Sequence, residues 1–106
     1  MNEVQITVEQ LKEKIDKGET LFLLDVREPF EHKIANIGGT LIPLKEIPKR
    51  MNELEKHAEI VVFCHHGGRS QRAAEYLRGN GFEHVKNLTG GIDAWSLKID
   101  PNVPRY

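Results

Sequence analysis

Two short segments of the chain are apolar at nearly every position, and they restrict the possible folds more than any other feature. Residues 21–26 read Leu-Phe-Leu-Leu-Asp-Val, and residues 60–63 read Ile-Val-Val-Phe. Neither run alternates polar and apolar side chains, as a strand with one face in water does. Both runs are therefore expected to form strands that are buried on both faces, so that helices must cover both sides of the sheet.

Helical patterns alternate with these strands along the chain. Thr7 and Gln10 have the spacing of a capping box, which predicts a helix that continues to Gly18. The other expected elements are a short helix over 29–34, a strand over 40–42, an amphipathic stretch over 49–56, a helix from about Ser70, a strand over 84–88, and a last helix after Gly90 and Gly91. This alternation predicts an α/β fold with a mostly parallel central sheet and helices on both faces. The length predicts a single domain over residues 1–106.

The charge balance excludes several classes of partner. Fifteen basic and sixteen acidic residues give a formal net charge of -1, which predicts no nucleic acid and no membrane surface as a partner.

No apolar run approaches the roughly 20 residues of a membrane-spanning helix, and no signal-peptide core is visible, so we expect a cytoplasmic protein. The single cysteine, Cys64, excludes an internal disulfide and a multi-cysteine metal site.

The segment after the second strand carries the chemistry. It reads Cys-His-His-Gly-Gly-Arg-Ser from Cys64 to Ser70, and it leads into a helix. Gly67 and Gly68 can adopt the positive φ angles of a tight concave loop, whose N–H groups then point inward. The start of the helix and Arg69 add positive charge. Such surroundings stabilise a thiolate, and they predict that Cys64 is a reactive nucleophile near neutral pH.

The loop residues also have plainer structural interpretations. A lone cysteine is more often a small buried side chain, but the glycine pair and Arg69 favour the reactive interpretation here. His65 and His66 could form a metal site, although neighbours in a loop usually point apart. We expect them to be polar loop residues, with no metal bound and neither of them acting as the general base.

Residues outside the loop are assigned mostly structural roles. Asp25 either supports the loop or a nearby arginine from the rim of the sheet, or only caps a turn. Arg27 and Glu31, four residues apart, are expected to form a structural ion pair, with substrate binding as the alternative, and Arg27 is, like Asp25, a candidate supporting residue of the site. Trp95 is expected in the core. Arg72 is expected to be solvated, with a contribution to the positive field as the alternative.

Three segments, in order, resemble the signatures of rhodanese-type sulfurtransferases. The loop from Cys64 to Ser70 looks like the active-site loop of that family. Residues 25–31, Asp-Val-Arg-Glu-Pro-Phe-Glu, resemble its first signature, and residues 88–95, Leu-Thr-Gly-Gly-Ile-Asp-Ala-Trp, resemble its C-terminal one. The resemblance runs from about Thr7 to Tyr106 and implies the rhodanese-like fold. Residues 35–37 read Ala-Asn-Ile where many members have Gly-His-Ile, so no role of that histidine is carried over.

The resemblance implies a thiosulfate sulfurtransferase that needs no metal or organic cofactor. The Cys64 thiolate would take the outer sulfur of a small anionic donor such as thiosulfate, or of a persulfide donor, and would pass it to a thiol, a protein or another thiophilic acceptor. Arg69 would orient the donor. Phosphatases and arsenate reductases that share this fold have Cys-x5-Arg, whereas this chain has Cys-x4-Arg, which favours a single sulfur as cargo. The implied persulfide-binding loop consists of His65, His66, Gly67, Gly68, Arg69 and Ser70.

The end of the chain points to a second interpretation. Residues 99–106 are similar to the end of rhodanese domains fused to E1-like adenylyltransferases, which serve the synthesis of sulfur-containing cofactors. The alternative is therefore a sulfur relay or docking module for a partner protein, with poor turnover of thiosulfate. A catalytically silent scaffold is disfavoured because both Cys64 and Arg69 are present.

Overall fold

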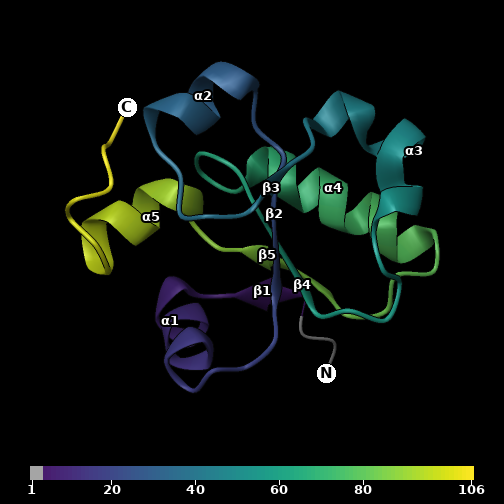
Figure 1. Cartoon of the computed structure of the whole chain (residues 1–106), viewed down its shortest axis with the longest axis horizontal. Coiled ribbons are helices and arrows are strands. Elements are labelled where there is room, and N and C mark those ends of the chain that lie inside the picture. Colours follow the sequence, from purple (N-terminus) through teal and green to yellow (C-terminus); the bar gives the residue numbers. More distant parts are fainter. Residues whose placement is uncertain (1–3) are drawn as a thin grey trace.

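The computed structural model describes residues 4–106 and contains one five-stranded sheet in the order β1-β5-β4-β2-β3 (Figure 1). Every neighbouring pair of strands in this sheet is parallel, as the two apolar runs predict. The strands are β1 (Gln5–Ile6), β2 (Phe22–Asp25), β3 (Thr40–Leu41), β4 (Ile60–Phe63) and β5 (Val85–Leu88).

Helices cover both faces of the sheet, and each face has its own apolar core. Val62 and Cys64 face α3 and α4, where they pack with Ala73 and Leu77. The intervening residue of β4, Phe63, faces α1 and α5 and their apolar side chains. The helices are α1 (Val8–Asp16), α2 (Pro29–Ile34), α3 (Ile47–Arg50), α4 (Gly68–Gly79) and α5 (Gly91–Lys98), and short 3-10 turns cover Leu44–Glu46 and Met51–Glu53. Among residues 4–106, no helix combines the length and the apolar character that a membrane span needs.

The capping box that the sequence predicts at the start of α1 is confirmed. The Gln10 N–H donates to the Thr7 hydroxyl at 3.1 Å, and the Thr7 N–H donates to the Gln10 side chain at 2.9 Å. The helix expected over 29–34 is α2, with Pro29 in its first turn. Figure 1 places α2 above the sheet, next to the loop that joins β4 to α4.

Two expected elements differ from the structure, and one strand was not expected. The stretch over 49–56 is not one helix. It contains the end of α3 and a 3-10 turn over Met51–Glu53, and the segment is held in the core by Ile47 before it and Leu54 within it. The helix after the loop starts at Gly68 and not at about Ser70. Strand β1 was not predicted, because two residues are too short to show a pattern.

Candidate active site

Cys64 lies directly after β4, at the carboxyl edge of the sheet where open α/β sheets bind ligands. Its side chain is 1% exposed, and the loop that follows it curls back over the sulfur. The turn depends on Gly67, whose φ of 114° lies in the left-handed region and which forms the N-cap of α4. Strand, glycine turn and helix start therefore place the thiol at the helix N-terminus, as the sequence predicts.

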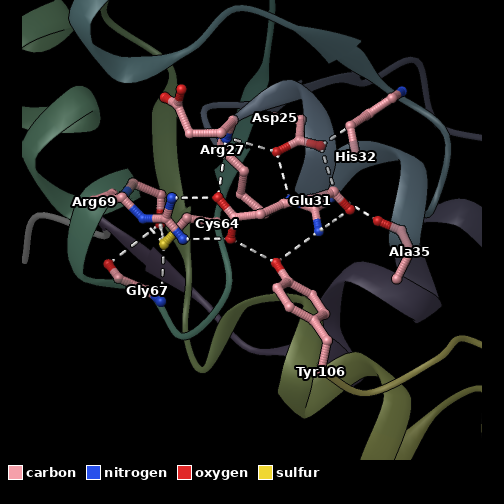
Figure 2. Close-up of polar contacts among 11 residues, drawn as sticks. Asp25, Arg27, Glu31, His32, Ala35, Cys64, Gly67, Arg69 and Tyr106 are labelled. Atoms are coloured by element: carbon pink, nitrogen blue, oxygen red, sulfur yellow. Dashed lines mark hydrogen bonds and ion pairs between the residues drawn. The ribbon is translucent and has the colours of Figure 1, made fainter.

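Three donors converge on the sulfur of Cys64. The N–H of Gly67 lies 3.1 Å from Sγ, the N–H of Ser70 lies at 3.4 Å, and the Ser70 hydroxyl lies at 3.3 Å. Figure 2 shows the Cys64 sulfur beside Gly67 and Arg69. Donors and a helix N-terminus that face one atom stabilise a negative charge on it, and this is the property that a nucleophilic thiolate or a persulfide requires.

Asn87, a buried residue in β5 that the sequence patterns did not indicate, belongs to the same network. The Ser70 hydroxyl also contacts the Asn87 side-chain oxygen and the Gly67 carbonyl, so its one proton is shared among three acceptors. The Asn87 amide donates in turn to Gln5 at 3.1 Å. An asparagine two residues after Val85, on the same face of the strand as that apolar residue, is the sequence signal that could have revealed it.

The first residues of α5 hold the backbone of the active-site loop by two hydrogen bonds. The N–H of Ile92 donates to the Cys64 carbonyl at 2.9 Å, and the N–H of Asp93 donates to the His65 carbonyl at 3.1 Å. Gly91 permits this approach, because a Cβ at that position would lie 2.5 Å from both carbonyl oxygens. The second glycine of the C-terminal signature is therefore a contact position for the active-site loop.

Arg27 and Asp25 form a fully buried ion pair beneath α2. Two guanidinium nitrogens of Arg27 donate to the two carboxylate oxygens of Asp25, at 2.8 and 2.7 Å. The expected pair between Arg27 and Glu31 is wrong, because Arg27 reaches Glu31 only at its main-chain carbonyl, at 3.3 Å. Asp25 accepts the Arg27 N–H as well, at 3.1 Å, so it both caps a turn and holds a nearby arginine. Burial makes this pairing necessary, since neither charge reaches water.

Glu31 pairs instead with Arg69 of the active-site loop. The two guanidinium Nη atoms donate to the two carboxylate oxygens at 2.7 and 2.9 Å, and the Tyr106 hydroxyl donates to the same carboxylate at 2.9 Å (Figure 2). The hydrogen bonds from Arg69 hold the pKa of Glu31 at about 2, although burial acts in the opposite direction. Glu31 is therefore ionised at any physiological pH, and the charge of Arg69 is compensated.

His65 and His66 stack on each other and on Tyr106. The ring of His65 lies 3.8 Å from that of Tyr106 and 3.9 Å from that of His66. Burial and the neighbouring His66 lower the pKa of His65, so its ring is uncharged at neutral pH.

With Asp93, the two histidines form the one group of possible metal ligands found within residues 4–106. The lone pairs of imidazole lie in the ring plane, so face-to-face rings do not aim them at a common point. Asp93 also binds Arg105 at 3.0 Å. This geometry does not favour a metal ion.

Comparisons with known proteins agree with this site. Residues 7–98 match the model of the rhodanese-like domain. The chain is 42% identical over 97 residues to the putative sulfur carrier protein YrkF of Bacillus subtilis, and it is 38% identical over 93 residues to a sulfurtransferase of Allochromatium vinosum. It is also 38% identical to the adenylyltransferase and sulfurtransferase MOCS3 of Arabidopsis thaliana. The chain covers 87% of the Allochromatium vinosum protein, but only 52% of YrkF and 26% of MOCS3. The alignments include 91% of this chain for YrkF, 87% for the Allochromatium vinosum protein and 98% for MOCS3.

Solved structures give the same result. A rhodanese-related protein from Thermoplasma volcanium superposes with a TM-score of 0.80 at 34% identity, over 94% of each chain. A rhodanese-like domain protein from Staphylococcus aureus has a TM-score of 0.83 at 31% identity, over 96% of this chain and 97% of the other. The five-stranded parallel sheet, the loop around the Cys64 sulfur and these similarities together establish that the chain belongs to the rhodanese-like sulfurtransferase family.

Proposed function

We propose that this chain transfers sulfane sulfur through a persulfide on Cys64. The observation that carries the proposal is the convergence of two backbone N–H groups and the Ser70 hydroxyl on Sγ. A persulfide places its negative charge on one terminal sulfur, and a small ring of donors at a helix N-terminus suits one such atom. The persulfide-binding role of the other loop residues, from His65 to Arg69, is part of this proposal.

The proposed reaction has two half-reactions. The Cys64 thiolate attacks the outer sulfur of the donor, a new S–S bond forms, and the donor's own S–S bond breaks with its electron pair leaving on the remainder. Thiosulfate would release sulfite, and a persulfide would release a thiolate. An acceptor thiolate then attacks the outer sulfur and restores Cys64. No external oxidant is consumed, and ping-pong kinetics are expected. A reducing compartment such as the cytoplasm is the setting that we propose, since a free thiol persists there.

A sulfur relay for partner proteins is the second candidate. The relatives support it: YrkF is named a putative sulfur carrier protein and MOCS3 an adenylyltransferase and sulfurtransferase, and the chain matches only 52% and 26% of their lengths. Both relatives are therefore longer than the part that this chain matches. On this alternative, the donor or the acceptor of Cys64 is a protein cysteine.

Intact-mass spectrometry tests the proposal directly. After incubation with thiosulfate or with a protein persulfide, the native chain is expected to gain one sulfur atom, about 32 Da, and Cys64→Ser is expected to gain none. Failure to gain mass from either donor would refute the function. Fast turnover of thiosulfate with cyanide supports the free-standing enzyme, and a very poor rate alongside rapid loading from a protein persulfide supports the relay.

A further inference from the structure

Three arginines that contact residues of the active site are each paired with a carboxylate. Arg27 binds Asp25 at 2.7 Å, Arg69 binds Glu31 at 2.7 Å, and Arg105 binds Asp93 at 3.0 Å. The Arg69 pair is the most important for the reaction, because Arg69 interacts electrostatically with Cys64. Glu31 raises the pKa of Arg69 most, and Cys64 raises it further. The sequence predicts a free positive charge at Arg69, whereas in the structure this charge is paired with the Glu31 carboxylate.

Other sources of positive charge do not replace it. His65 is uncharged at neutral pH, because burial lowers its pKa. Arg72 lies two residues after Ser70, about 200° further around α4. It lines a groove with Leu44 and Tyr76 and is not one of the three donors to the Cys64 sulfur. What remains around Sγ is a set of dipoles, the N–H groups and the hydroxyl, and these suit about one negative charge.

The charge of the donor therefore decides how well it can react. Attack on thiosulfate brings a thiolate and a dianion together, three negative charges in all, and produces the Cys64 persulfide anion and sulfite. Attack on a donor with a single negative charge brings only two together. In a partly buried site, like charges a few ångströms apart interact strongly enough to change rates by one or more orders of magnitude.

We propose that Glu31 is a specificity-determining residue: by neutralising Arg69 it selects sulfur donors that carry at most one negative charge at the reacting end, such as a protein persulfide, over thiosulfate. This inference rests on the proposed function and names the donor class of the same site. Tyr106 supports the selection, because its hydroxyl holds the Glu31 carboxylate against Arg69. Glu31 acts through Arg69 and is not itself a catalytic residue.

Two donors that differ by one charge test the proposal. Thiosulfate is a dianion, and methanethiosulfonate is a monoanion that gives up its sulfane sulfur in the same way and leaves as methanesulfinate. The rate at which Cys64 gains one sulfur is measured for each donor by intact mass, at neutral pH and low salt. The quantity compared between variants is the ratio of the two rates, so the intrinsic reactivities of the donors cancel.

Glu31→Gln is expected to raise the thiosulfate-to-methanethiosulfonate ratio about tenfold, because it frees one positive charge that the dianion uses more than the monoanion. Glu28→Gln is the matched control, since it makes the same charge change three residues away. Glu28 and Glu31 form a capping box, and this variant keeps it, because the N–H of residue 28 still donates to the Glu31 carboxylate and the glutamine oxygen can still accept the Glu31 N–H. An unchanged ratio in Glu31→Gln, or an equal rise in Glu28→Gln, overturns the inference. Absence of sulfur loading from every donor in the native chain refutes the proposed function instead.

If Glu31→Gln fails to fold, a measurement on the native chain tests whether the charge of Arg69 is neutralised. The rate of loading from thiosulfate is followed as ionic strength increases from about 0.01 to 0.1 M, over which the screening length falls from about 30 to 10 Å. A neutralised site leaves only repulsion between the thiolate and the dianion, so the rate is expected to stay level or rise. A steep fall would mean that Arg69 attracts the donor with a free charge, and would overturn the inference.

Discussion

The contact between Gly91 and the active-site loop can be tested by adding a single methyl group. Gly91 has a φ of 62°, in the left-handed region, and a Cβ there would lie 2.5 Å from the carbonyl oxygens of both Cys64 and His65. That distance is about 1 Å shorter than the ~3.5 Å at which non-bonded heavy atoms attract each other. Gly91→Ala must therefore displace the loop, α5, or both.

The magnitude follows from two contributions. A left-handed backbone costs alanine about 1–2 kcal/mol, and the smaller entropy of its unfolded chain offsets about 0.4–1 kcal/mol of this. Overpacking adds about 1–3 kcal/mol, and weakening of the hydrogen bond from Ile92 to the Cys64 carbonyl adds about 1 kcal/mol. We expect Gly91→Ala to lower the free energy of unfolding by about 3–5 kcal/mol.

Gly18→Ala is the matched control for backbone strain. Gly18 has a φ of 74°, but nothing lies within 4 Å of the position that its Cβ would occupy. Its substitution should therefore cost only about 1 kcal/mol. Urea unfolding followed by circular dichroism measures both variants. If Gly91→Ala is destabilised no more than Gly18→Ala, the close approach of α5 to the loop does not constrain the protein as we argue.

Three further outcomes are expected. Asp25→Asn leaves the fully buried Arg27 without its carboxylate and should lower the free energy of unfolding in urea by about 3–5 kcal/mol; a loss below about 1 kcal/mol would contradict the pairing. Glu31 has its folded pKa lowered from 4.5 to about 2, so the stability it contributes is complete above pH 4.5 and is lost as the pH falls toward 2. Because the side chain of its arginine partner is 37% exposed, screening reduces this contribution to about 1–2 kcal/mol, and the difference in unfolding free energy between the native chain and Glu31→Gln should shrink between pH 7 and pH 3. Ser70→Ala removes one of the donors to the Cys64 sulfur and should slow alkylation by iodoacetamide at pH 7 about fivefold; an unchanged rate would assign the hydroxyl to Asn87 alone.

Most of the fold follows from local patterns. The apolar runs at residues 21–26 and 60–63 indicated β2 and β4, and the capping box at Thr7 indicated α1, because these signals depend on neighbours a few residues apart. The segment around α3 did not follow, since its shape depends on where Ile47 and Leu54 reach the core. β1 exists only through its pairing with β5, which lies about 80 residues further along the chain.

The site divides in the same way. The sequence alone determined that Cys64 ends a buried strand, that glycines shape the turn after it and that a helix begins there, because strand, turn and helix are contiguous. Only the tertiary structure decided which charges meet. Glu31 and Arg69 are 38 residues apart, and Arg27, which the spacing assigned to Glu31, binds Asp25 instead. Buried ion pairs form where tertiary packing brings opposite charges together away from water, and the spacing of residues along the sequence does not predict which charges will pair. The nucleophile could therefore be identified from the sequence, whereas the net charge around it depends on the folded arrangement.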